Sequence, residues 1–407
     1  MRPRRLVGGA IFIALVVIGG VRCNRSGGGG GGTGPSGATL KVVAGKDKQA
    51  GLTNGVVQVQ VELTGATDIN SQTIDWTVTG GGGSVPATSQ TSNTGIGTVN
   101  WTLGSSIGVQ GLKAEYTEPG SSTTLKVDIV AVGVTNPACV PGRYFNGVLA
   151  TGENWTSTGG AIVLPNGANT PSNGLLSIAA GTTVCLGPLQ NIVLDHGGRL
   201  SAGGAGAPLT FTGMDLAQPW GSLRFDGAPA QPSTISNAML DHGSLGAIGL
   251  SAGHVLQIDN STITEMTGLG VRIIAPGSFV HSTNISNIGG QPGSFGAKLG
   301  SAVAPSAVLD FSARVTNTVG IQIEGASAVL TACEIANSTG GIYVLSDAGS
   351  VSINGCNITG NGIGIMNQAT GSVDATGNWW GNPAGPSGNS GTVDASGWLG
   401  GPVSLGY

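Results

Sequence analysis

The sequence predicts an all-β protein in which a β-sandwich precedes a parallel β-solenoid. Of its 407 residues, 75 are glycine and only 9% are charged, while 39% are hydrophobic, so a core can form without helix-favouring runs. Near the C-terminus, Ile335 and Ile358 are 23 residues apart, and so are Cys333 and Cys356. A repeat of this length with short strands and no helical segment is typical of a solenoid.

The N-terminus has the features of an export signal. Three arginines precede an apolar run at residues 6–21 and then Cys23. This run of 16 residues is shorter than the ~20 of a membrane span. The arrangement resembles the lipobox of bacterial lipoproteins, which implies lipidation of Cys23, although Arg22 stands where that family has Gly, Ala or Ser. Ordinary signal cleavage and an uncleaved anchor are the alternatives.

Each of these alternatives places the protein outside the cytoplasm, in the outer membrane, at the cell surface or in the medium. The anchor at residues 1–23 would be its only contact with a membrane. The glycine-rich residues 24–37 have nothing to bury and are predicted to form a flexible tether.

Residues 38–132 are predicted to form the β-sandwich, because alternating strands are separated by turn residues at intervals typical of that fold. The expected strands are 39–43, 56–63, 73–79, 97–103, 112–116 and 123–131. The segments 74–85, 95–104 and 108–114 resemble bacterial immunoglobulin-like domains of the invasin/intimin type. That resemblance implies a spacer or adhesive module, with Trp76 and Trp101 in its core.

Residues 133–144 contain Pro and Gly breakers and are predicted to form a joint, after which the solenoid spans 145–407. Strand–turn–strand units recur 22 residues apart at 258–263 and 280–285, and a longer interval predicts a loop around residues 289–300. A Trp-Gly-x-Leu-x-Phe coil at 220–225 and a final Asn-Trp-Trp-Gly resemble right-handed parallel β-helix repeat proteins of the pectin-lyase-like fold.

An open end of stacked coils exposes apolar core and unpaired backbone groups. Residues 377–407 are therefore predicted to be a C-terminal cap in which Trp379, Trp380 and Trp398, with Leu399, cover the core.

Four cysteines besides Cys23 are disulfide candidates in an oxidising compartment. Cys139 and Cys185 flank the start of the solenoid and could join it covalently. Cys333 and Cys356 occupy equivalent positions in successive coils, roughly 4.8 Å apart. A disulfide and a stack of buried thiols are equally consistent with that distance.

The candidate reactive side chains are few. Asp195-His196 and Asp241-His242 are the same dipeptide 46 residues apart, so two coils of 23 could bring them to one edge as an acid/base pair or metal ligands. The favoured interpretation is structural, because a glycine follows each pair and Asp and His tolerate turns. His254 and His281 are interpreted as surface or turn residues. No spacing indicates a metal site or a cofactor.

The sequence favours a non-catalytic, exported protein that presents a β-helix for adhesion or for binding a polysaccharide, a cell-surface ligand or matrix. The alternative is a polysaccharide lyase or glycoside hydrolase, which would need clustered carboxylates for calcium or a pair of carboxylates as acid and base, and the sequence displays neither. A structural component of a surface layer is a third possibility. The net charge of −4 without a basic stripe argues against nucleic-acid binding.

Overall fold

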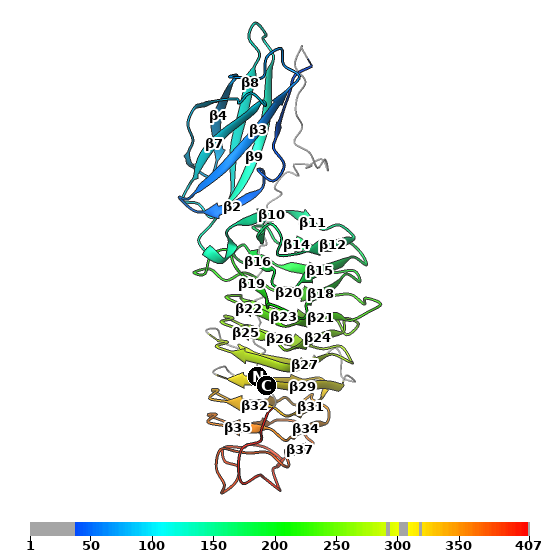
Figure 1. The fold of residues 1–407 in the computed structure, drawn as a ribbon. Coiled ribbons are helices and arrows are strands. Elements are labelled where there is room, and N and C mark those ends of the chain that lie inside the picture. The colour runs from blue at the N-terminus through cyan, green and yellow to red at the C-terminus, as the bar shows by residue number, and fades with distance from the viewer. Residues whose placement is uncertain (1–36, 290–293, 301–307, 317–319, 406–407) are drawn as a thin grey trace, which may run out of the picture.

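The computed structural model describes residues 37–289, 294–300, 308–316 and 320–405. It is an elongated all-β molecule in which a β-sandwich stands on one end of a solenoid (Figure 1). Sandwich strands run along the long axis and solenoid strands run across it. Within the described ranges, no helix has the length and apolar character needed to cross a membrane. The predicted export signal, Cys23 and most of the tether lie outside the described residues.

The sandwich consists of two sheets around one core. One sheet has the order β1-β3-β7-β5, and the other the order β6-β4-β8-β9-β2. The strands are β1 (Thr39–Val42), β2 (Gln49–Leu52), β3 (Val56–Thr64), β4 (Thr73–Gly80), β5 (Gly83–Ser84), β6 (Thr88–Gln90), β7 (Ile96–Leu103), β8 (Gly108–Thr117) and β9 (Thr124–Val134). Trp76 and Trp101 are buried between the sheets, as predicted. The relation to immunoglobulin-like domains stays a prediction.

The solenoid has three faces of parallel strands, called here faces 1, 2 and 3. Face 1 contains β11 (Gly147–Val148), β14 (Ala168–Asn169), β17 (Ile192–Leu194), β20 (Leu223–Phe225), β23 (Leu245–Gly249), β26 (Leu269–Ile273), β28 (Phe295–Gly300), β30 (Ile321–Glu324), β33 (Ile342–Val344) and β36 (Ile365–Asn367). Face 2 contains β12 (Gly152–Trp155), β15 (Leu175–Ala179), β18 (Arg199–Gly203), β21 (Ser233–Ser236), β24 (Leu256–Asp259), β31 (Ser327–Thr331), β34 (Val351–Asn354), β37 (Val373–Asp374) and β38 (Val393–Asp394).

Face 3 contains β10 (Gly142–Tyr144), β13 (Ala161–Leu164), β16 (Thr183–Leu186), β19 (Leu209–Gly213), β22 (Ala238–Asp241), β25 (Thr262–Thr264), β32 (Glu334–Ala336) and β35 (Asn357–Thr359). The longer strands β27 (Phe279–Ser286) and β29 (Val308–Thr316) bend from face 2 into face 3. The predicted loop at 289–300 is wrong in its second half. Despite its glycines, that segment pairs in register with β26 as strand β28.

The corner between faces 2 and 3 explains part of the sequence repeat. A single residue in the left-handed region makes the bend, as at Asn237 (φ 48) and Asn260 (φ 45), and asparagine and glycine are the residues that adopt this region most readily. The residue after each bend points inward and is buried. Five of these residues carry a polar or sulfur atom, and we call them the inner-corner ladder: Ser261, Thr283, Cys333, Cys356 and Asn378.

The inner-corner ladder bonds successive coils through side chains. The Ala238 N–H donates to Ser261 Oγ (3.2 Å), the Cys333 N–H to Cys356 Sγ (3.2 Å), and the Cys356 N–H to Asn378 Oδ1 (2.8 Å). Backbone donors at the bend would otherwise be buried without a partner, which is costly. Cys333 and Cys356 are therefore buried thiols in this ladder rather than a disulfide.

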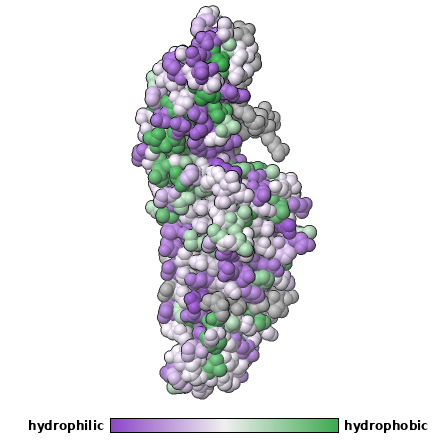
Figure 2. All heavy atoms as spheres, viewed as in Figure 1, coloured by the Kyte–Doolittle hydropathy of each residue, from purple (hydrophilic) through white to green (hydrophobic). Residues whose placement is uncertain are grey.

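The joint between sandwich and solenoid is one continuous sheet. Strand β2 pairs with β9 of the sandwich and also with β10, so Ala50 is opposite Gly142. A separate apolar cluster fills the joint, and a disulfide links Cys139 to Cys185. Figure 2 shows hydrophobic surface gathered at this level, over the lower part of the sandwich. The sandwich thus covers the N-terminal end of the solenoid.

The C-terminal cap closes the other end. Trp380 belongs to the solenoid core. Trp379 is hydrogen-bonded to the preceding coil: its N–H donates to Cys356 O (2.9 Å), and its carbonyl accepts from the Ile358 N–H (2.8 Å). The prediction for Trp398 and Leu399 is wrong, because these side chains are 44% and 36% exposed. Trp380 already covers the core, so Trp398 lies outside it, against the cap loop, and donates to Pro383 O (3.3 Å).

Candidate ligand-binding face

The two Asp-His dipeptides do not lie on one edge, which overturns the stacking that their spacing suggested. Asp195 follows β17 on face 1, whereas Asp241 ends β22 on face 3, in register with Thr264. The 23-residue period fails between them because a loop at 214–222 lengthens the intervening coil. Both histidines have left-handed backbone conformations (φ 50 for His196 and 54 for His242), which agrees with the favoured role in turns.

Each Asp-His pair is a local contact. His196 Nδ1 is 2.8 Å from Asp195 Oδ2 on an exposed turn. His242 Nε2 is 2.7 Å from Glu265 Oε2, and Glu265 is the residue with positive φ at the same turn one coil later. Across the described part of the chain, no three His, Cys, Asp or Glu side chains form a group that could hold a metal ion. These contacts therefore serve turn stacking.

His254 is buried, with 1% exposure, so its interpretation as a surface or turn side chain is wrong. Its Nδ1 lies 3.0 Å from Asp226 O, and its Nε2 lies 2.7 Å from Ser233 Oγ. Because a carbonyl only accepts, Nδ1 carries the proton and Nε2 accepts from Ser233. Burial lowers the pKa of His254, which keeps the ring neutral. Ser233 is itself fully buried and accepts from Leu200 N–H (3.0 Å), so this pair is closed to a substrate.

His281 remains at the surface, where its ring stacks on Phe279 with a centroid separation of 4.3 Å.

Face 1 brings together side chains that are scattered in the sequence. One outward column runs in register over seven coils, and we call it the face-1 column: Arg224, Ile248, Arg272, Lys298, Gln322, Tyr343 and Met366. This column was not identified in the sequence analysis. The positions of the column recur every 21–26 residues in the sequence, which was the signal, but the column mixes basic, polar and apolar types.

A half-buried charge network lies in the middle of the face-1 column. Glu324 Oε2 is 2.9 Å from Lys298 Nζ, and Glu324 Oε1 is 3.5 Å from Arg272 Nη2. Two cations from successive coils thus share one carboxylate, which leaves a net positive charge. Arg272 Nε is also buried and without a hydrogen-bond partner among the described residues. In a partly desolvated setting, such a site favours an added anion.

Apolar surface borders the charges. The Phe295 and Tyr343 rings meet edge to face at 5.7 Å, so they bridge coils on either side of β30. Toward the N-terminal end, exposed Arg224 borders a hollow of about 270 Å³ that Leu245, Ile248 and Leu250 also line. The face-1 column therefore offers positive charge with aromatic and aliphatic surface on a rigid sheet.

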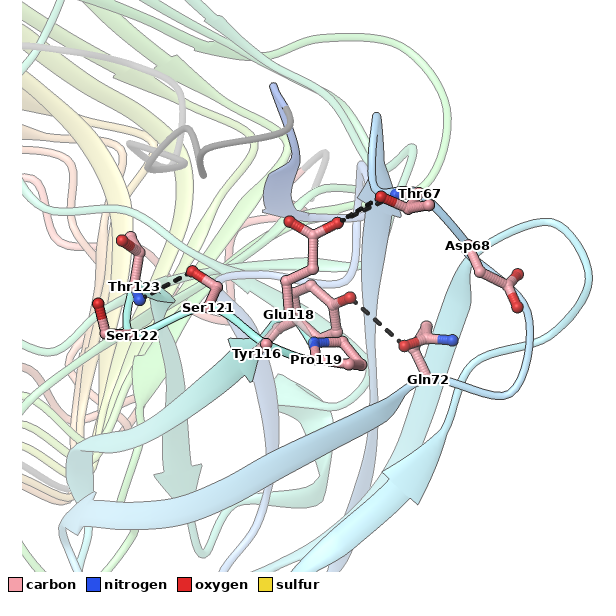
Figure 3. Close-up of a pocket in the computed structure, with 10 residues that line it drawn as sticks. Thr67, Asp68, Gln72, Tyr116, Glu118, Pro119, Ser121, Ser122 and Thr123 are labelled. Atoms are coloured by element: carbon pink, nitrogen blue, oxygen red, sulfur yellow. Dashed lines mark hydrogen bonds between the residues drawn. The ribbon is translucent and has the colours of Figure 1, made fainter.

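A larger hollow of about 860 Å³ lies at the far tip of the sandwich (Figure 3). Glu118 Oε1 accepts from the Thr67 N–H (3.1 Å) and hydroxyl (3.0 Å), and Tyr116 donates to Gln72 (3.4 Å). Burial, followed by the charge of Glu118, raises the pKa of Tyr116. These groups therefore satisfy one another.

The same tip is where the described chain begins. Thr39 pairs with Thr64, directly before the loop that lines this hollow. Gly37, the first described residue, thus lies at the end of the sandwich opposite the solenoid.

Comparison with known protein families supports the repeat architecture. Residues 227–379 match the family model described as a right-handed β-helix region. This part of the chain is a right-handed β-helix. The match begins in the coil that contains β20 and ends at Trp379 in the cap, so the β-helix predicted from the 23-residue repeat is confirmed. No curated protein and no solved structure matches the chain.

Proposed function

We propose that the protein is an exported, non-catalytic binding protein that presents face 1 of its β-helix to an acidic polysaccharide or matrix glycan, with the sandwich as a spacer. The observation that carries the proposal is the face-1 column. There, Arg272 and Lys298 outnumber Glu324, and Arg224 adds a further exposed cation. Guanidinium groups bind carboxylates and sulfates well, while Phe295 and Tyr343 supply apolar surface for sugar rings.

The same network argues against catalysis on this face. A hydrolase needs two carboxylates across the scissile bond, and a calcium-dependent lyase needs several oxygen ligands together. Glu324 is instead bonded by two cations, and Gln322 Nε2 lies 3.3 Å from it. Both oxygens of this carboxylate are already occupied by these contacts, so it is poorly placed to reach a glycosidic oxygen or to bind a metal ion.

The disulfide at the joint supports export, and the position of Gly37 at the sandwich tip is compatible with tethering. The Cys139–Cys185 disulfide is of the kind that persists in oxidising compartments. Attachment through residues 1–37, with Cys23 as the proposed lipidated residue, would hold the sandwich tip toward the membrane and direct the β-helix outward. In that orientation face 1 is accessible along its length.

The test is a glycan array and a polysaccharide-degradation screen on residues 38–407. We expect binding of acidic glycans without product release. Binding should weaken by about tenfold or more in Arg272→Gln/Lys298→Gln, since hydrogen bonds to charged groups contribute ~1.5–3 kcal/mol. Arg314→Gln, which breaks the comparable pair with Glu334 on face 3, should bind like the wild type. Release of unsaturated or reducing sugar would establish the enzyme alternative instead.

The anchor is tested separately. Cys23→Ala should release the protein from the membrane fraction, because one acyl-bearing residue would be its attachment point. Unchanged membrane association would exclude the lipoprotein proposal while leaving the binding proposal intact.

A further inference from the structure

A third hollow, of about 480 Å³, lies where the sandwich meets the first coil of the solenoid. The turn between β1 and β2 forms one wall, and strands β10 and β12 form the other. Its volume is within the range of small-ligand pockets, which occur preferentially at domain interfaces. It lies apart from the face-1 column, on the side of the first coil where β12 has no preceding strand.

The floor of this junction pocket is aromatic. The Phe145 and Trp155 rings meet at 60° with centroids 5.8 Å apart. Trp155 is buried and its Nε1–H donates to Glu153 Oε1 (3.1 Å), which fixes both side chains. Phe145 is only half-buried, so part of its ring is available to a ligand.

The rim carries four charged side chains that form no ion pairs with one another. Asp47, Lys48, Arg143 and Glu153 all line the pocket, yet no ion pair joins any of them to another described residue. Arg143 Nη2 donates to Thr156 O (3.3 Å), but its Nε is buried and has no hydrogen-bond partner in the described part of the chain. An unsatisfied donor of this kind is costly in a folded protein unless a ligand or water completes it.

Lys48 is held at the rim by its backbone. It has a left-handed conformation (φ 54), and both of its backbone groups are hydrogen-bonded. Its N–H donates to Val130 O (2.9 Å), and its carbonyl accepts from the Tyr144 N–H (2.7 Å). Such a conformation in a residue other than glycine costs of order 1 kcal/mol and occurs often at binding sites. The joint between the two domains therefore fixes the position of Lys48.

We propose that the junction pocket binds a single saccharide residue, either a free sugar or the terminal unit of a glycan. Two cations and two carboxylates balance in charge, which disfavours a highly charged ligand. They also supply both donors and acceptors, which suits a polyhydroxylated ring. The apolar face of that ring would lie on Phe145, with hydroxyls accepting from Arg143 and Lys48 and donating to Asp47 and Glu153. This site goes beyond the extended face proposed above.

The test uses the full-length protein in a detergent without a sugar headgroup. Saturation-transfer NMR with D-glucose, D-galactose, D-mannose, N-acetyl-D-glucosamine and D-galacturonate should identify at least one bound sugar. Arg143→Gln and Phe145→Ala should each weaken its binding tenfold or more. Lys48→Gly removes the ammonium group and should therefore weaken binding. Because glycine adopts φ 54 without strain, the unfolding temperature should stay unchanged or rise.

Further measurements separate the alternatives. Arg272→Gln/Lys298→Gln on face 1 should leave sugar binding unchanged, so failure of either proposal is seen independently of the other. A short oligosaccharide of the preferred sugar binds as tightly if the pocket takes a chain terminus, and is excluded if it takes a free sugar. The proposal is overturned if no sugar in the panel gives saturation transfer at about 10 mM, or if binding persists in all three pocket variants.

Discussion

Asn378 fastens the C-terminal cap to the coil before it, and its loss should open the end of the β-helix. The side chain is fully buried. Its Oδ1 accepts from the Cys356 N–H (2.8 Å), and its Nδ2 donates to Ile353 O (2.6 Å) and Ala375 O (2.7 Å). In Asn378→Ala these three backbone groups would be buried without partners.

The expected cost follows from those three groups. Each buried backbone group left without a partner costs about 1–3 kcal/mol, and single substitutions that exceed ~5 kcal/mol are exceptional. We therefore expect Asn378→Ala to lower the free energy of opening the last coils by about 3–5 kcal/mol. Because solenoid coils contact only their neighbours, the loss should be confined to the C-terminal end.

Amide hydrogen exchange resolves that local opening. A loss of 3 kcal/mol corresponds to more than about 100-fold faster exchange, which should be seen at Cys356 and Ile358 and not at Ile162 in the first coils. Asn382→Ala is the matched control in the same cap, since the exposed Asn382 side chain accepts only from the Ala384 N–H (2.9 Å) among the described residues. Exchange at Cys356 within about threefold of the wild type would refute the role assigned to Asn378.

Three further predictions concern the joint, the buried histidine and the cap. Replacing Cys139 and Cys185 by alanine removes a link across 46 residues, which by loop entropy should cost about 4 kcal/mol; an unchanged unfolding temperature would contradict this. Burial lowers the pKa of His254 in the folded protein below its unfolded value of ~6.5. At pH values between these two pKa values, the unfolded chain therefore binds more protons than the folded protein. Stability should therefore fall below pH 6.5 by up to ~1.4 kcal/mol per pH unit, and His254→Gln should flatten that slope in pH-dependent urea unfolding. Trp380→Ala should cost ~3–5 kcal/mol in thermal unfolding and Trp398→Ala under ~1; equal effects would place both tryptophans in the core.

The sequence was most informative where the repeat is regular. The 23-residue spacing of Cys333 and Cys356 predicted stacked coils, because each coil must return the chain to the same place in the core. It left thiols and a disulfide open, since stacked positions suit both, and the backbone N–H bonded to Cys356 Sγ is visible only in three dimensions.

Prediction failed where coil length changes. Asp195 and Asp241 are two nominal periods apart, but the loop at 214–222 moves the second pair to another face. The face-1 column escaped detection for a related reason. Outward positions of a sheet carry no constraint on residue type, so Arg272, Lys298 and Glu324 form a network only through register.

The sheet that runs through the joint has a mechanical consequence. If the molecule is pulled between residue 37 and the C-terminal coils of the solenoid, the hydrogen bonds of the sandwich lie across the axis and are loaded in shear. Those between solenoid coils lie along the axis and are loaded one coil at a time. The Cys139–Cys185 link carries tension past the 45 residues between its cysteines, so the first coils cannot be drawn out. Under load, the coils beyond residue 185 would be the part that lengthens.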